Sequence, residues 1–286
     1  MEAVLASPWT TWGIAAAATA GVIFRPFAWP DFVWAVLGAG LLVALGLLSV
    51  ADAWTGVAKG TDVYLFLIGM MLLSELARQE GLFDWLAARA ARLARGSASR
   101  LFGLIYAVGT VVTVFLSNDA TAVVLTPAVA AVAKAARTEE PLPFLLVCAL
   151  IANAASFVLP ISNPANLVLY GDHMPPLLAW LPRYALPSVA SIVATYVVLR
   201  WSQRAALRQS IAEDIEIPTL PLSGRLAALG IAVTACVLLA ASSLDWPLGL
   251  PTFCAGLGTA LVVLTCSRAG AGEIVRSVSW GVLPLV

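Results

Sequence analysis

Apolar residues follow one another in long runs along this chain, separated by short polar or proline-containing connections. A helix that crosses a bilayer needs about 20 mostly apolar residues. On this measure the sequence predicts spanning helices over residues 10–25, 32–50, 62–79, 143–170, 177–199, 226–243 and 248–266, and a last one that begins near Val278. The pattern therefore predicts an all-α polytopic membrane protein.

One run is interrupted by polar residues far from any obvious surface loop. The stretch "VTVFLSNDATAVVLTP", from Val112 to Pro127, places Ser117, Asn118 and Asp119 in a row. Polar groups within a bilayer are costly unless they are paired or used. We therefore expect these side chains to have a partner or a function.

Basic residues indicate how this interrupted segment, about 101–136, crosses the membrane. Its two apolar runs, 101–116 and 120–133, are each short for a core of about 30 Å. If the segment is a re-entrant hairpin and the N-terminus is outside, 14 of the 16 basic residues lie on the cytoplasmic side. A single span gives 7 inside and 9 outside. Because cytoplasmic loops are enriched in Lys and Arg, the hairpin is favoured.

A second break lies in "IANAASFVLPISNPANLVLYG", within the span 143–170. Pro160 and Pro164 are four residues apart, and no straight helix continues comfortably through both. We predict a discontinuous helix whose first half ends near Leu159 and whose second half begins with Pro164. Ser162 or Asn163 would cap the second half. In the same way, Asn118 or Asp119 would cap the helix after the hairpin tip.

An internal repeat suggests the domain organisation. The segment "AWPDFVWAVLGAGLLVAL" (28–45) is similar to a segment about 217 residues later, "DWPLGLPTFCAGLGTALVVL" (245–264). The predicted topology gives the two copies opposite orientations in the membrane. This is the inverted-repeat architecture of secondary transporters. We expect a first repeat over 1–199, a cytoplasmic linker over 200–224, and over 225–286 the start of a second repeat that is truncated. Residues 82–95 are expected to form a basic interfacial helix.

Composition narrows the classes of function. Hydrophobic residues make up 61% of the 286 residues, charged residues only 11%, and the formal net charge is zero, so charge gives no case for a nucleic-acid partner. One His and four Cys do not provide a clustered metal site. The cysteines are interpreted as small buried packing residues: Cys148, Cys236, Cys254 and Cys266. We expect no cofactor and no metal.

The motifs "FLSNDATAVVLTP" and "IANAASFVLPISNPANLV" resemble motifs of the bacterial arsenical pump membrane proteins, which export arsenite and antimonite. That family is part of a superfamily of ion transporters that includes citrate and dicarboxylate carriers and sodium–proton antiporters. The resemblance extends over the whole chain and implies an inner-membrane carrier with its substrate between two hairpin tips and two unwound helices. The second hairpin and second unwound helix are absent from this sequence. Carried over by position, the substrate-binding residues are Ser117, Asn118, Thr121, Asn153, Ser162, Asn163 and Asn166.

Asp119 is the candidate for proton coupling, since an ionisable group inside a bilayer is a functional candidate. Removal from water favours the protonated acid, whereas a helix N-terminus and nearby amides favour the carboxylate. The competing interpretation is that Asp119 is only a helix cap.

Two further classes of function remain in view. A carrier of a dicarboxylate or another small ion, coupled to sodium or protons, is the alternative, although Asp119 would repel an anionic substrate. An intramembrane enzyme is disfavoured, because the sequence has no His-Glu-x-x-His motif and Asp172-His173 is expected in an outer loop. The sequence leaves open whether a cytoplasmic ATPase subunit, or a second copy of the chain in a homodimer, is a partner.

Overall fold

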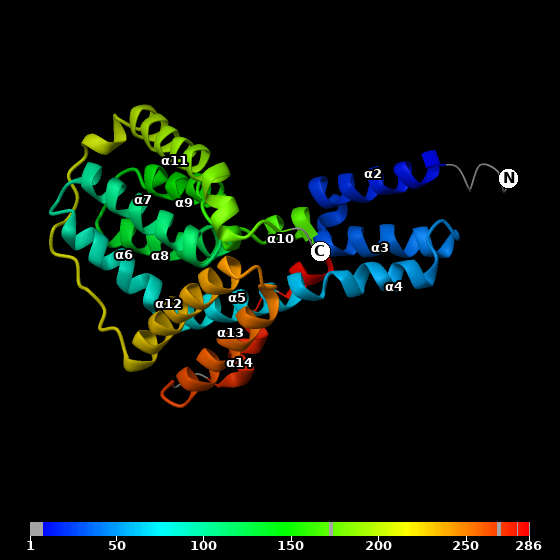
Figure 1. Cartoon of the computed structure of the whole chain (residues 1–286). Coiled ribbons are helices and arrows are strands. Elements are labelled where there is room, and N and C mark those ends of the chain that lie inside the picture. Colours follow the sequence, from blue (N-terminus) through cyan, green and yellow to red (C-terminus); the bar gives the residue numbers. More distant parts are fainter. Residues whose placement is uncertain (1–7, 172–173, 268–269, 279, 286) are drawn as a thin grey trace. The chain divides into compact units, whose positions relative to one another are not determined.

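A computed structural model describes residues 8–171, 174–267, 270–278 and 280–285. The described residues form helices and no β-strand, which confirms the predicted all-α fold class (Figure 1). Two compact units are present, one within residues 1–64 and 279–286 and the other within 65–278. Asp172 and His173 lie outside the described residues.

The first unit contains α2 (Pro8–Phe24), η1 (Pro26–Ala28), α3 (Asp31–Ala44), α4 (Val50–Lys59) and η6 (Trp280–Leu285). Helices α2 and α3 pack closely, and a Cβ on Gly21 would lie 2.5 Å from the ring of Trp34.

The predicted span 32–50 is wrong at its end, because α3 stops at Ala44 and a new helix begins at Val50. Gly46 has a φ of +70° and interrupts the helix. Ser49 then caps α4 by accepting a hydrogen bond from the N–H of Asp52. A helix thus occupies a stretch expected to be a polar connection.

The second unit begins within α5 (Thr61–Gln79) and holds the two interrupted segments. Its further helices are α6 (Leu82–Leu93), α7 (Ala98–Phe115), α8 (Thr126–Ala135), α9 (Leu142–Ala154), α10 (Pro164–Tyr170), α11 (Leu177–Ser202), α12 (Leu222–Ser243), α13 (Gly249–Leu264) and α14 (Ala271–Ser277). Among the described residues, three helices are long and apolar enough to cross a membrane, namely α7, α11 and α12, and a fourth span results if α4 and α5 count as one broken helix.

The segment between α6 and α9 reverses its direction. Thr121, just after the tip, contacts Thr113 and Gly109 of α7. At the opposite end, the carbonyls of Gly96 and Ala136 accept hydrogen bonds from two consecutive residues, Ile211 and Ala212, of the linker between α11 and α12. The two ends of the segment therefore lie side by side, as a hairpin requires.

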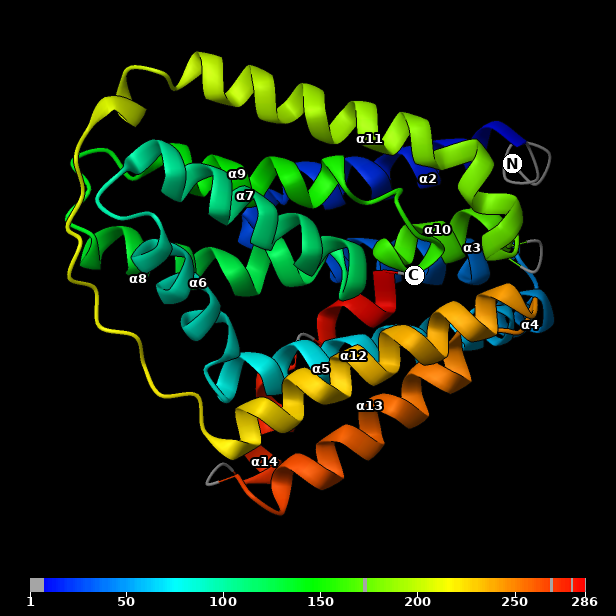
Figure 2. The ribbon, with the colours of Figure 1, turned by 60° about the vertical axis from the view of Figure 1, so that its left-hand side comes forward.

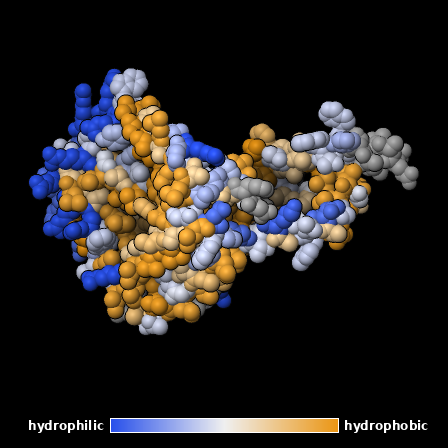
Figure 3. All heavy atoms as spheres, in the orientation of Figure 1, coloured by the Kyte–Doolittle hydropathy of each residue, from blue (hydrophilic) through white to orange (hydrophobic). Residues whose placement is uncertain are grey.

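Helix α6 is amphipathic. Its apolar face packs on α7 and α8, with six buried residues: Leu82, Phe83, Ala87, Ala88, Ala90 and Ala91. Arg89 and Arg92 are exposed on its other face. Figure 3 shows hydrophilic residues gathered at the end of the second unit where α6, α7 and α11 meet the linker, with hydrophobic residues over the flanks of the helices. This division is typical of a membrane protein in which one end of the helices is exposed to water.

The interpretation of the cysteines as buried is wrong for three of the four. Cys148 is buried, whereas Cys236, Cys254 and Cys266 are exposed. Outward-facing positions of a spanning helix contact lipid, which is as apolar as a protein core, so apolar character does not predict burial here.

Candidate functional site

The hairpin tip is capped by Ser117. Helix α7 ends at Phe115, and the Oγ of Ser117 accepts a hydrogen bond of 3.3 Å from the N–H of Ala120. Asp119 makes no capping bond. The prediction that Asn118 or Asp119 caps this helix is therefore wrong, because the helix resumes immediately after Ser117 and places both within its first turn.

The helix after the tip is widened before it becomes regular. Residues Ala120–Leu125 form a π-helix (η2), and α8 follows from Thr126. Pro127 has no N–H to donate to the carbonyl four residues earlier, which favours such a widened turn. The hydroxyl of Thr126 also bonds back to the carbonyl of Ala122 at 2.7 Å.

Thr121 lies inside the hairpin. Its side chain is fully buried, and its Oγ1 is 2.8 Å from that of Thr113 in α7. The pair links the two arms of the hairpin just below the tip. In this conformation the hydroxyl of Thr121 holds the hairpin closed.

The second predicted break is present, five residues earlier than expected. Helix α9 ends at Ala154 instead of near Leu159. The hydroxyl of Ser156 bonds to the carbonyls of Ala152 and Asn153, where the helix ends. Such side-chain bonds compete with helical continuation.

The chain then passes through a short 3₁₀ turn, η3 (Pro160–Ser162), before α10 begins at Pro164 as predicted. Asn163 is the cap, because its Oδ1 accepts from the N–H of Ala165 at 2.9 Å. The buried amide of Asn166 donates to the carbonyls of Ser156 and Pro160. Asn166 thus holds the unwound backbone in shape.

Ser162 joins the two breaks. Its fully buried hydroxyl accepts from the N–H of Leu159 at 3.1 Å and donates to the carbonyl of Val114, near the end of α7, at 3.0 Å. The hairpin tip and the unwound segment are therefore packed against each other by a direct hydrogen bond.

Other predicted site residues lie differently. Asn118 has its Oδ1 buried with no hydrogen-bond partner among the described residues. Asp119 and Asn153 are exposed, and the Nδ2 of Asn153 reaches only the carbonyl of Ala149 in its own helix, at 3.4 Å. The structure thus buries Ser117, Ser162 and Asn166 in the packed region, whereas Asp119 and Asn153 are exposed.

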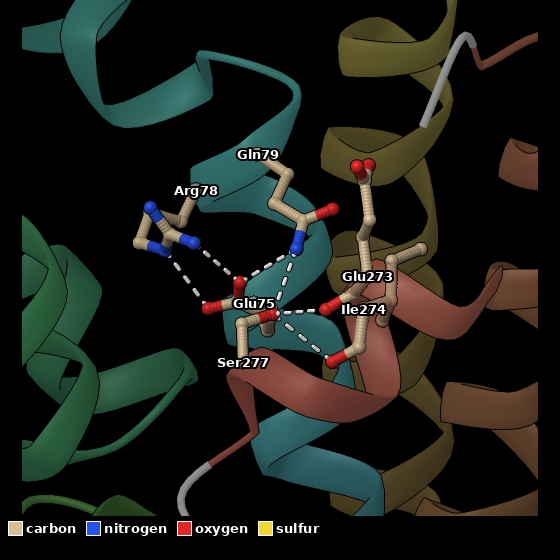
Figure 4. Close-up of polar contacts among 6 residues, drawn as sticks. All are labelled: Glu75, Arg78, Gln79, Glu273, Ile274 and Ser277. Carbon is tan, nitrogen blue, oxygen red and sulfur yellow. Dashed lines mark hydrogen bonds and ion pairs between the residues drawn. The ribbon is translucent and has the colours of Figure 1, made fainter. Parts of the chain in front are cut away.

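A polar cluster at the end of α5 was not predicted (Figure 4). The carboxylate of Glu75, which is buried, accepts hydrogen bonds from the guanidinium of Arg78 and from the Nε2 of Gln79. Gln79 also bonds to the hydroxyl of Ser277 in α14, which in turn reaches the carbonyl of Glu273. The cluster fastens α5 to α14.

Next to it, the buried carboxylate of Glu80 accepts hydrogen bonds from the hydroxyls of Ser223 and Ser267. The signal in the sequence was "SELARQE", two carboxyl groups at the end of an apolar run. Because the partners of Glu80 lie 143 and 187 residues away, no local pattern could identify them.

The profile of the CitMHS family, described as citrate transporter, matches residues 19–286. The chain belongs to this family. The family is described as a transporter family, and the apolar helices of the described residues agree with a multi-pass membrane protein.

The predicted resemblance to arsenical pumps is confirmed. This family member is 28% identical over 276 residues to the arsenical pump membrane protein of Escherichia coli (strain K12), covering 87% of this chain and 60% of that protein. The arsenical pump membrane protein of Yersinia enterocolitica is 27% identical over 259 residues, with 86% and 59% covered. A putative arsenical pump membrane protein of Bacillus subtilis is 29% identical over 149 residues, with 51% and 34% covered. The chain thus spans about three fifths of the length of the first two relatives.

Proposed function

We propose that this transporter exports arsenite or antimonite in exchange for protons, through a site formed by the hairpin tip and the unwound segment. The relatives named arsenical pumps support the substrate. The observation that carries the site is the bond from Ser162 to Val114, which holds both breaks together.

Neutral arsenite is a small trihydroxide, so amide and hydroxyl groups can bind it by hydrogen bonds. Asn118 supplies a buried carbonyl oxygen that has no hydrogen-bond partner in the part of the chain that the structure describes. A buried polar atom without a partner calls for an explanation, and a substrate hydroxyl would satisfy it. Capture by three thiolates is disfavoured, because Cys148 is the only buried cysteine among the described residues.

Asp119 is the proposed proton carrier. It makes no capping bond, so the competing role of a helix cap has lost its support. Its side chain is exposed on the packed helices, and Ser117, two residues earlier, fixes the turn. In the proposed cycle the carboxyl of Asp119 takes up and releases protons from a water-filled space that reaches it.

Everted membrane vesicles with an imposed pH gradient test this function. We expect accumulation of arsenite that collapses when the gradient is dissipated, and competition by antimonite. Vesicles with the gradient that accumulate no arsenite would contradict the proposal.

Transport of citrate or a dicarboxylate is the second candidate, favoured by the family description itself. Asp119 stands against it, because a carboxylate near the tip would repel an anion. Uptake of labelled citrate into the same vesicles, with and without a sodium gradient, separates the two candidates.

A further inference from the structure

The linker between α11 and α12 is ordered along the ends of the hairpin. Figure 2 shows this segment running past the ends of α7, α8 and α9 on its way to α12. Three apolar side chains anchor it, each at most 6% exposed: Leu207, Ile211 and Ile215. A flexible tether would not bury residues in this way.

Two consecutive amides of the linker hold the two ends of the hairpin. The N–H of Ile211 donates to the carbonyl of Gly96 at 3.0 Å, and the N–H of Ala212 donates to the carbonyl of Ala136 at 2.9 Å. Gly96 lies just before α7 and Ala136 just after α8. Because neighbouring residues are about 3.8 Å apart, these bonds fix the separation of the two ends.

The end of α8 has a turn that leaves the carbonyl of Ala136 available to the linker. After α8, the N–H groups of Arg137 and Thr138 bond to the carbonyls of Lys134 and Ala133, the pair typical of a Schellman turn. Arg137 accordingly has a φ of +51°, although it is not glycine.

The other end is built for a close approach. Gly96 has a φ of +74°, and a Cβ there would lie 2.7 Å from a carboxylate oxygen of Glu213 in the linker. A residue larger than glycine would therefore displace the side chain of Glu213 as well as strain the backbone.

Gln209 adds a third attachment, to the turn between α8 and α9. Its Oε1 accepts from the N–H of Glu139 at 2.7 Å and of Glu140 at 3.4 Å, and its Nε2 donates to the carbonyl of Glu140 at 3.2 Å. One side chain thus binds the connection from the hairpin to the broken helix.

We infer that residues 207–215 form a clamp that fixes the two ends of the hairpin and thereby positions its tip against the unwound segment. Ser162 holds the hairpin at its tip, and the clamp holds it at its base. Hairpin, broken helix and linker then move as one body. The consequence for transport rests on the proposed function, whereas the clamp itself does not.

Hydrogen exchange of the protein in lipid nanodiscs tests the clamp without any substrate. The amides of residues 211 and 212 should exchange at least about tenfold more slowly than those of residues 216, 217, 219 and 220, which find no hydrogen-bond partner in the described part of the chain. Equal exchange along the whole linker would overturn the inference.

Proline substitution tests its effect on the tip. Ile211→Pro and Ala212→Pro each remove one donor, and Ile211→Val and Ala212→Ser are matched controls that keep it. We expect amides of residues 116–121 to exchange about fivefold faster in each proline variant, as the loss of one hydrogen bond of about 1 kcal/mol implies, and at the wild-type rate in the controls.

If the proline variants do not fold, a milder substitution tests the same inference. Gln209→Leu leaves the backbone donors intact and should accelerate exchange of residues 138–140 and of the tip. Unchanged exchange at the tip in the folded variants would overturn the positioning role. Slower arsenite transport in the same variants is expected. A wild-type protein that transports no arsenite contradicts the proposed function but leaves the exchange results valid.

Discussion

The two interruptions share the dipeptide Ser-Asn, yet the structure uses it in opposite ways. At the hairpin tip Ser117 is the cap and Asn118 has a buried oxygen without a partner. In the unwound helix Asn163 is the cap, and Ser162 bonds to two backbone groups. The capping residue is therefore the serine at the tip and the asparagine in the unwound segment.

Pro164 is the physical reason for the difference. Proline fits the first position of a helix, so the residue before it has to be the cap. The tip has no proline after Asn118, so its helix begins one residue earlier relative to the dipeptide. The proline therefore moves the start of the helix by one residue relative to the Ser-Asn dipeptide, and with it the residue that acts as the cap.

Ser162→Ala should have the largest effect on stability. It leaves a buried N–H at Leu159 and a buried carbonyl at Val114 without their partner, which costs about 3 kcal/mol. Thermal unfolding in detergent measures the loss. As a control, Ser202→Ala removes an exposed hydroxyl that bonds only within its own helix and should stay within about 0.5 kcal/mol of wild type. A change below 1 kcal/mol at Ser162 would mean that the two breaks are not held together by this bond.

Asn163→Ala comes next, with a loss of about 1 kcal/mol for the missing cap. We also expect it to abolish arsenite resistance in cells while membrane insertion is kept. Asn163→Ser retains a capping oxygen and restores stability. If the serine variant restores resistance as well, Asn163 is a cap and does not bind substrate.

Asn118→Leu is expected to be neutral or to stabilise the protein by up to about 1 kcal/mol, because it removes a buried oxygen without a partner. Arsenite uptake into everted vesicles should nevertheless be lost. A variant that is less stable than wild type would show that the oxygen has a structural partner.

Asp119→Asn should change stability least, by less than about 0.5 kcal/mol, since the side chain makes no capping bond. Uptake driven by a pH gradient should vanish while gradient-free exchange of arsenite survives, because an amide cannot carry a proton. Accumulation of arsenite against its gradient by this variant would remove Asp119 from the coupling mechanism.

Local sequence predicted where the chain breaks, because proline and clusters of polar residues within apolar runs act on their immediate neighbours. It predicted the start of α10 at Pro164 and the reversal near Asn118. It misplaced the end of α9, where the hydroxyl of Ser156 ends the helix before either proline is reached. The inverted repeat and the boundaries of the repeats stay predictions.

The sequence by itself therefore determined the helical membrane class and the approximate positions of both interruptions, since these depend on runs of apolar residues and on the backbone limits of proline. The family followed from the resemblance of its motifs. Only the tertiary structure decided which polar side chains meet. The bond from Ser162 to Val114 and the attachment of Ile211 to Gly96 join residues 48 and 115 positions apart. Such pairs depend on how helices pack, and no periodicity within a single helix contains that information.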